Sequence, residues 1–450
     1  MTLIHRRAWL ALAASALLAA CASTPDPKSL PPVVFVHGNG DTAALWTTTL
    51  WRFESNGWPR DKLYAVDFTD PLARDDDGMA QPGRSSAADS AQALAAEVDA
   101  VLQRTGAAKV VLVGNSRGGN AIRNYVQNFG GAAKVERAVL GGTPNHGVWI
   151  DPKRLPNNEF NGAGSFLTGL NTPKGPNGDE VTPGVAWMTI RSDNNDKFAQ
   201  ADGVWIGAKG TPTNVTFDGP ALKGANNVVL PGRDHRETSY HAESFAKTFE
   251  FITGRAPAVS AIAAEANPLL DGKISSSANR PLAGASIEVY AVAADTGARL
   301  GPALHRQTVA ADGRWGPLRA DPKAFYEFVV TAPGYAVTHI YRSPFPRSSN
   351  VVHFRPERLA DADKDAQSLV VLTRPRGYFG LPRDRIVFDG AAPPGVPQGV
   401  AGVSSSKLKL KDGAGRPVVA EYDSGTIHER LAGAAWSTAE NRVVVLELQD

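Results

Sequence analysis

The stretch VVLVGNSRGGNAIRNYV, from Val110 to Val126, changes within two residues from an apolar run to a polar segment. Its first four residues are typical of a buried strand, and the part after Gly118 is typical of a helix. Ser116 stands at this junction in the pattern G-x-S-x-G, because Gly114 precedes it and Gly118 follows it by two positions. Glycines there permit a sharp turn that pushes a serine hydroxyl out at the end of a sheet. The pattern predicts a nucleophilic serine; the alternative is an ordinary loop serine in a glycine-rich chain.

Apolar strands alternate with helical segments on both sides of this stretch. Such strands, buried on both faces and joined by helices, form parallel sheets, so the sequence predicts an α/β domain with a mostly parallel sheet over residues 33–255. The expected strands are Val33–Gly38, Lys62–Phe68, Lys109–Gly114, Val135–Gly142, Ala186–Ser192 and Asn226–Gly232. The expected helices include Ser86–Gly106, Asn120–Phe129 and a closing helix at Tyr240–Gly254. Residues 143–185 are rich in Gly, Asn and Pro without clear periodicity, which predicts a lid-like insert.

The pattern changes after a linker at residues 256–268. Short alternating strands with turn signals predict an all-β C-terminal region, with a β sandwich over residues 269–355. Further strand-like runs over residues 356–450 predict an additional β unit or an extension of the first. The aromatic residues of this region could contact a substrate surface, although such residues more often fill a sandwich core. They include Trp315, Tyr335, Tyr341, Phe345 and Tyr378.

The N-terminus has the composition of an export signal. A basic start precedes a short apolar run that ends in small residues. The single cysteine, Cys21, closes the sequence LAAC and resembles the lipidation site of bacterial lipoproteins. We expect a signal peptide over residues 1–20 and a lipidated Cys21 at the start of a spacer over residues 21–32. The protein would then be a cell-envelope lipoprotein held at a membrane surface; a secreted protein with an incidental cysteine is the alternative.

Charge and cysteine content narrow the range of partners. The 450 residues include 47 Lys and Arg against 45 Asp and Glu, a balance that gives no reason to expect a nucleic-acid partner. The Asp and His residues show no tight ligand spacing and no thiol is left in the mature body, so neither a metal nor a cofactor is expected. The sequence leaves the oligomeric state open.

A serine nucleophile needs a base and an acid that orients the base. After a G-x-S-x-G turn of this kind, the acid and then the histidine follow in chain order. His235, directly after the last expected strand, is the expected base, and His241 is the competing candidate. The loop after the strand that ends at Ser192 offers Asp196, which is preferred, and Asp193; the alternative role of either residue is to cap or turn the loop.

A glycine-rich loop, His37-Gly38-Asn39-Gly40, follows the first expected strand. Such a loop can direct a backbone N–H at an oxygen that gains negative charge in acyl transfer. We expect the N–H groups of Asn39 and Arg117 to form the oxyanion hole, with Asn39 as a simple turn residue as the alternative. His37 is expected to be structural, because the base must come later in the chain. The Arg117 side chain could bind an acidic substrate group or pair with a carboxylate.

Three segments together resemble the bacterial lipases and esterases of the α/β-hydrolase superfamily. They are His37-Gly-Asn-Gly, Gly114-Asn-Ser116-Arg-Gly-Gly and Gly142-Thr-Pro-Asn-His-Gly147, joined by the late acid and His235. The region after the linker is similar to transthyretin-like, or carboxypeptidase-regulatory-like, domains. The resemblance implies a serine carboxylic-ester hydrolase that acts on an ester or lipid through a Ser116–His235–Asp196 triad and an acyl-enzyme. The alternatives are an acyltransferase or amidase with the same triad, and a non-catalytic surface-binding lipoprotein.

Overall fold

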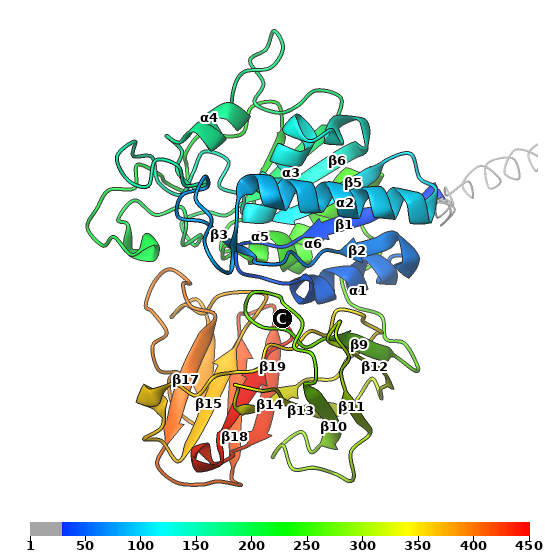
Figure 1. The fold of residues 1–450 in the computed structure, drawn as a ribbon, viewed down its shortest axis with the longest axis vertical. Coiled ribbons are helices and arrows are strands. Elements are labelled where there is room, and N and C mark those ends of the chain that lie inside the picture. The colour runs from blue at the N-terminus through cyan, green and yellow to red at the C-terminus, as the bar shows by residue number, and fades with distance from the viewer. Residues whose placement is uncertain (1–28) are drawn as a thin grey trace, which may run out of the picture. The chain divides into compact units, whose positions relative to one another are not determined.

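The computed structural model describes residues 29–450 (Figure 1). Its N-terminal part is built on a six-stranded sheet in which all five neighbouring pairs run parallel. The strands lie in the order β2 (Leu63–Ala65), β1 (Val33–Val36), β5 (Val110–Asn115), β6 (Val135–Gly141), β7 (Ala186–Arg191) and β8 (Asn226–Val229). The predicted α/β fold with a mostly parallel sheet is confirmed. The expected signal peptide over residues 1–20 and Cys21 lie outside the described residues.

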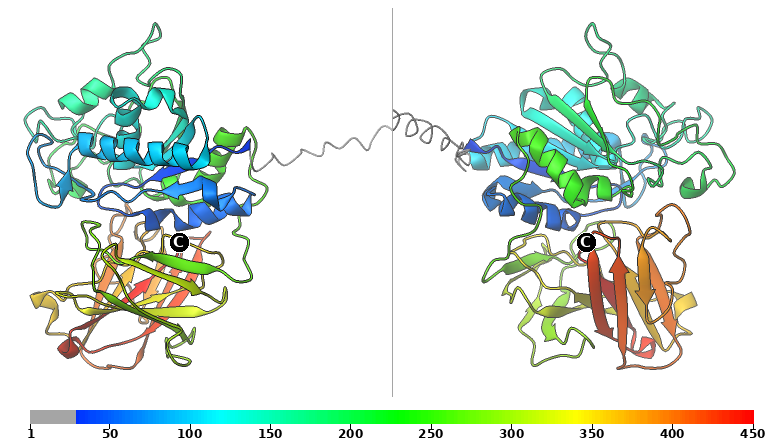
Figure 2. Two further views of the ribbon diagram at one scale, coloured as in Figure 1. Left: turned by 45° about the vertical axis from the view of Figure 1, so that its right-hand side comes forward. Right: turned by 180° about the vertical axis from the view of Figure 1, so that it is seen from behind.

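Helices cover both faces of this sheet (Figures 1 and 2). They are α2 (Ala87–Thr105) and α3 (Arg117–Asn128) on one face, and α1 (Thr47–Ser55) and α6 (Ala242–Thr253) on the other. Successive side chains of β1 point to opposite faces of the sheet. Val34 and Val36 pack in the core under α2 and α3, whereas Phe35 packs against Phe53 of α1 with ring centroids 5.5 Å apart. Burial on both faces is why the strands are continuous apolar runs.

Local sequence signals determine where some of the helices begin and end. α2 begins after Ser86, which forms a capping box with Asp89, and ends at Gly106 with a φ of 67°. The predicted single closing helix is wrong at its start, because two helices, α5 (Glu237–Tyr240) and α6, meet at His241. The backbone of His241 is extended there, and its Nδ1 accepts the N–H of Glu243 at 3.2 Å as the N-cap of α6.

Two segments outside the six-stranded sheet lie near the candidate site: a small pair of strands and the insert. A small parallel pair, β3 (Leu72–Ala73) and β4 (Arg84–Ser85), lies between β2 and α2. The predicted lid-like insert, residues 143–185, is mostly loop and contains one short helix, α4 (Ser165–Leu170). Both segments contact the candidate site.

The C-terminal region is all β and is organised by one mixed seven-stranded sheet. Its strand order is β11 (His305–Thr308), β10 (Ser286–Val292), β13 (Phe325–Thr331), β14 (Val337–Arg342), β20 (Arg442–Glu447), β15 (Ser368–Thr373) and β17 (Ser405–Leu410). The C-terminal strand β20 runs parallel to both β14 and β15. Strands from residues 269–355 and from residues 356–450 therefore share this sheet.

Both faces of the seven-stranded sheet are covered. Along β20, Val443 and Val445 enter one core, and Val444 and Leu446 enter another. The first core includes the pair β9 (Leu269–Lys273) and β12 (Arg314–Arg319), and the second includes β16 (Arg385–Phe388), β18 (Pro417–Asp423) and β19 (His428–Ala434). The continuous apolar runs in β15 and β20 follow from this double burial.

The two regions belong to one compact unit, residues 31–450. Trp51 of α1 enters the first β core, and its Nε1 donates to the carbonyl of Ser348 at 2.8 Å. Across the described residues, no helix combines the length and the apolar character needed to cross a membrane.

Candidate active site

Ser116 forms the turn between β5 and α3, with a φ of 54° in the left-handed region. Its N–H donates to the carbonyl of Gly141 at 2.8 Å, which ties the turn to β6. The flanking glycines are sterically required, since a Cβ on Gly114 would lie 2.8 Å from the nitrogen of Gly119. The turn presents Ser116 at the carboxyl ends of the central strands, with the N-terminus of α3 behind it.

The two expected oxyanion donors lie beside Ser116. The Asn39 side chain is used locally, because its Oδ1 accepts the N–H of Ala73 at 2.8 Å and so joins the loop after β1 to β3. Arg117 is the first residue of α3. The backbone N–H groups of Asn39 and Arg117 make no hydrogen bond to other residues within 29–450. They remain available to an oxyanion.

The Arg117 side chain pairs with a carboxylate, the second of the two expected alternatives. Its Nε is bonded to Glu159 of the lid-like insert, and both side chains are at most 4% exposed. The guanidinium also donates to the carbonyl of Ser85 at 2.8 Å and to that of Pro71 at 2.9 Å. Burial raises the pKa of Glu159 against the opposing effect of Arg117. Arg117 thus links the insert and the β3–β4 pair to the turn at Ser116.

His235 and Asp196 come together although they lie on different loops. His235 Nδ1 is 2.9 Å from Asp196 Oδ1 and 3.0 Å from Oδ2. The His235 side chain is 4% exposed. Asp196 is fixed in turn, because its Oδ1 accepts the N–H of Phe198 at 2.9 Å. His235 Nε2 is buried and has no hydrogen-bond partner among the described residues.

The competing candidates have other partners. Asp193 accepts the N–H of Gly232 at 3.0 Å. Burial acts to raise the pKa of Asp193, but its hydrogen bonds outweigh burial and hold that pKa below the ordinary range. His241 caps α6. His37 donates from Nδ1 to its neighbour Gly38 and accepts the N–H of Phe68 at 3.1 Å on Nε2, so both of its nitrogens serve the fold.

A cavity of about 260 Å³, called the serine cavity below, adjoins Ser116 and His235. Its wall is largely apolar and aromatic, with a few polar groups near the serine turn. The wall includes Val148, Trp149 and Phe160 of the insert, Phe198, Trp205 and Ile206 after β7, and Tyr378 of the C-terminal region. Mostly apolar pockets with a few convergent polar groups are the usual form of small-molecule sites.

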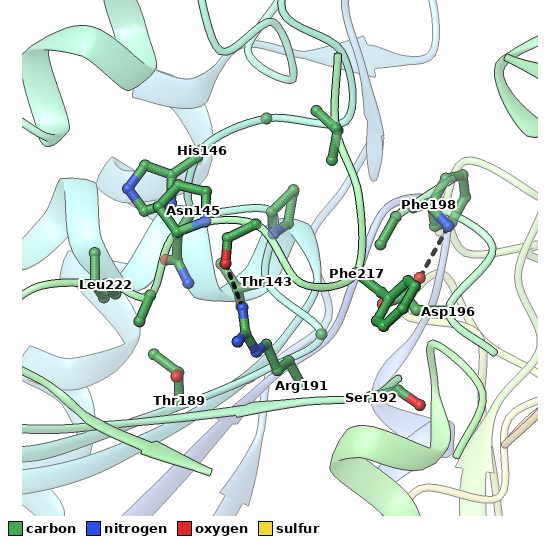
Figure 3. Close-up of a pocket in the computed structure, with 18 of the residues that line it drawn as sticks. Thr143, Asn145, His146, Thr189, Arg191, Ser192, Asp196, Phe198, Phe217 and Leu222 are labelled. Carbon is green, nitrogen blue, oxygen red and sulfur yellow. Dashed lines mark hydrogen bonds between the residues drawn. The ribbon is translucent and has the colours of Figure 1, made fainter. Parts of the chain in front are cut away.

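A second cavity, of about 240 Å³, adjoins Asp196 and His235 but not Ser116. Figure 3 shows Asp196 and Phe198 at one end of it and Asn145 and His146 at the other, with Arg191 between them. His235 lines both cavities, whereas Asp196 lines only the second.

Two basic residues that the sequence does not single out lie at the serine cavity: Arg236 lines it, and Lys197 contacts the ring of its wall residue Tyr378. Arg236 pairs with Asp41 at 2.5 Å, and its guanidinium lies 4.7 Å from the centre of the Tyr378 ring. Lys197, next to Asp196, has its ammonium 4.1 Å from the same ring. Burial, together with the charge of Arg236, lowers the pKa of Lys197 to about 8. Only the position of Lys197 and Arg236 beside the expected acid and base could have singled them out.

Two family models match this chain. Residues 30–150 match the class 2 lipases, and residues 267–359 match the lipase C-terminal domain. Among solved structures, the chain is similar to the mature form of Bacillus licheniformis lipase BlEst2, at 20% identity over 51% of this chain and 94% of that one, with a TM-score of 0.35. The propeptide form of the same lipase aligns at 14% identity over 91% and 93%, with a TM-score of 0.37. Phospholipase PlaB from Legionella pneumophila aligns at 12% identity over 92% of both chains, with a TM-score of 0.35.

The first match contains the turn at Ser116 and the glycine-rich loop after β1, and the second lies in the all-β region. Residues 30–150 include the three segments that resemble lipases and esterases, whereas Asp196 and His235 lie outside both matches. The chain is a carboxylic ester hydrolase of the lipase and esterase type, with an α/β-hydrolase domain followed by a C-terminal domain.

Proposed function

We propose that this lipolytic hydrolase cleaves esters with Ser116 as nucleophile, His235 as base and Asp196 as the acid that orients the base. The observation that carries the proposal is the state of His235. Its Nδ1 is bonded to Asp196, its Nε2 is buried and has no partner within residues 29–450, and His235 lines the same cavity as Ser116. A neutral imidazole that donates from Nδ1 carries no proton on Nε2, and Nε2 is the atom that takes a proton from a serine hydroxyl.

The reaction runs in two steps. Ser116 Oγ attacks the ester carbonyl carbon while His235 Nε2 accepts the hydroxyl proton, and Asp196 stabilises the imidazolium. The N–H groups of Asn39 and Arg117 hold the negative oxygen of the tetrahedral intermediate. His235 then gives the proton to the departing alcohol, which leaves an acyl ester on Ser116. Water attacks this ester with His235 again as base, and the carboxylic acid is released.

The wall of the serine cavity favours an apolar acyl group. Aromatic and aliphatic side chains from the insert and from the loop after β7 surround the space next to Ser116. An ester or lipid whose acyl chain fills this space gains burial, while its carbonyl remains near the two N–H donors.

The organisation of the full chain is part of the proposal. Residues 33–255 form the catalytic domain, with the lid-like insert at 143–185 and a linker at 256–268. Residues 269–355 form a transthyretin-like sandwich, which the strands of residues 356–450 extend. After cleavage of residues 1–20, lipidated Cys21 holds the protein at the cell envelope. A Cys21→Ala variant should move from the membrane fraction to the soluble fraction; an unchanged distribution contradicts the anchor and favours a secreted protein.

The catalytic proposal is tested by hydrolysis of p-nitrophenyl esters of increasing acyl length, with wild type beside Ser116→Ala. Ser165→Ala is the matched control, because Ser165 is an exposed serine at the start of α4. We expect activity in wild type and control and none in Ser116→Ala. Intact-mass measurement after a fluorophosphonate should find one adduct that Ser116→Ala lacks. Hydrolysis that survives Ser116→Ala contradicts the proposal.

A further inference from the structure

The segment between β15 and β16 contacts the loop that carries His235. Arg374 donates from Nη1 to Asp234 Oδ2 at 3.1 Å and from Nη2 to Glu237 Oε1 at 2.7 Å. Asp234 directly precedes His235, and Glu237 follows it by two positions. All three interacting side chains are at most 3% exposed. One guanidinium of the C-terminal region thus spans the two residues that flank the base.

Those two carboxylates hold the backbone of the His235 loop. Asp234 Oδ1 accepts the N–H groups of Arg236 at 2.8 Å and Glu237 at 2.9 Å. Glu237 Oε2 accepts the N–H of Asp234 at 2.9 Å. The path of the chain on either side of His235 is therefore set by the hydrogen bonds of these two carboxylates.

The positive charges that compensate these carboxylates come from the C-terminal region. Arg383 donates to Glu237 Oε2 at 3.0 Å and, like Arg374, pairs with Asp234. Burial acts to raise the pKa of Glu237, but Arg374 and Arg383 outweigh it and hold that pKa at about 2. Burial and the neighbouring charge of Glu237 raise the pKa of Asp234 against the opposing effect of the same two arginines. A buried carboxylate that loses its cation must either reorganise or take up a proton.

The same segment reaches the serine cavity. The backbone N–H of Tyr378 donates to Asp234 Oδ2 at 2.7 Å, and Tyr378 lines the cavity that adjoins Ser116. The carbonyl of Tyr378 accepts from Arg374 at 3.2 Å and from Arg383 at 2.8 Å. One network therefore joins the two arginines, a wall residue of the cavity and the His235 loop.

We infer that Arg374 is a positioning residue for His235, and that the C-terminal β region therefore contributes to catalysis by holding the His235 loop in place. This inference rests on the proposed role of His235. The contact involves residues 374–383, beyond residue 359, where the match to the lipase C-terminal domain ends. Arg374 holds Asp234 and Glu237 in place, and their hydrogen bonds to the backbone of this loop orient His235 at the serine cavity.

The test compares Arg374→Met, Arg374→Lys and Arg347→Met in the full chain, with kcat and KM measured for p-nitrophenyl butyrate. Arg347→Met is the matched control, because Arg347 of the C-terminal region also pairs with a hydrolase carboxylate, Glu54 at 2.9 Å, but does not line the serine cavity. We expect Arg374→Met to lower kcat about 10- to 100-fold, as for a displaced catalytic group, with KM changed less than about twofold. Arg374→Lys keeps the charge but cannot span both carboxylates, so its kcat should be intermediate. The control should keep the kcat of wild type.

The outcomes separate this inference from the proposed function. Wild type that hydrolyses no ester contradicts the proposed function. Active wild type with unchanged kcat in Arg374→Met contradicts the positioning role, as does an equal loss in Arg347→Met, which would indicate general weakening of the interface. If Arg374→Met does not fold, Arg374→Lys decides: a folded variant with the kcat of wild type overturns the inference, and a lowered kcat at constant KM supports it.

Discussion

Gly118 lies against the carboxyl end of β1 so closely that a Cβ on it would be 2.3 Å from the carbonyl oxygen of Val36. The same Cβ would lie 2.6 Å from the carbonyl oxygen of His37. The first turn of α3 therefore packs directly on the backbone that leads into the Asn39 loop. This contact sets the spacing between the two N–H groups proposed to hold the oxyanion.

Gly118→Ala should damage both stability and catalysis. The added methyl must push the Val36 backbone away from α3, since backbone atoms cannot rotate aside. We expect a loss of about 1–3 kcal/mol in the free energy of unfolding, measured in urea, and a clear loss of kcat in the folded protein. The control is Gly169→Ala in α4, where a Cβ meets no atom within 4 Å. That change should be neutral or stabilising by up to about 1 kcal/mol. Equal stability and equal activity of the two variants would contradict the spacing argument.

Asp196→Asn and Asp193→Asn should differ sharply in activity. An asparagine at position 196 keeps the size of the side chain but removes the charge that fixes the tautomer of His235, so kcat should fall about 10⁴-fold. An asparagine at position 193 can still accept the N–H of Gly232, so kcat should stay within a few-fold of wild type. Steady-state kinetics of both variants on one ester decide the matter. A larger loss in Asp193→Asn would exchange the roles of the two acids.

Helix ends and tight turns could be predicted from the sequence where the residues that determine them lie within a few positions of one another. The capping box that starts α2 and the G-x-S-x-G turn at Ser116 are of this kind. The break at His241 could not be predicted, because the apolar spacing continues through it while the side chain acts as a cap. The contact between Arg374 and Asp234 spans 140 positions and has no local signature. Its energy arises only when two buried carboxylates and two arginines meet in the folded chain.

Arg117 and Glu159 should show strong coupling in a double-mutant cycle. Arg117→Met leaves the Glu159 carboxylate buried without its cation, which should lower the free energy of unfolding by about 3–5 kcal/mol. Adding Glu159→Leu removes the stranded charge and should recover part of that loss. Urea unfolding of the two single variants and the double variant measures the coupling. Additive losses would contradict a cooperative pair.

The same cycle also tests the role of the Arg117 main chain. The backbone N–H of residue 117 is present whatever its side chain, so the folded double variant should keep kcat within about tenfold of wild type. Complete loss of activity in a folded double variant would mean that the Arg117 side chain acts in catalysis itself.

His241 should make stability depend on pH in mildly acidic solution. Burial, with the charge of Arg233 beside it, lowers the pKa of His241 from 6.5 to about 4. Below pH 6.5 the unfolded chain takes up this proton while the folded protein does not. The contribution is therefore complete above pH 6.5 and is lost as the pH falls through about 4. A shift of this size corresponds to about 3 kcal/mol.

His241→Asn isolates this contribution. Asparagine is a good N-cap and can accept the N–H of Glu243 in place of the imidazole, but it does not titrate. Urea unfolding of wild type and variant at about pH 7, 5.5 and 4 should give similar stabilities at the highest pH and a steeper decline for wild type. Carboxylates titrate in both proteins, so the difference between the two curves reports on His241. Parallel curves would mean that His241 is protonated in the folded state, in which case its Nδ1 could not accept the N–H that starts α6.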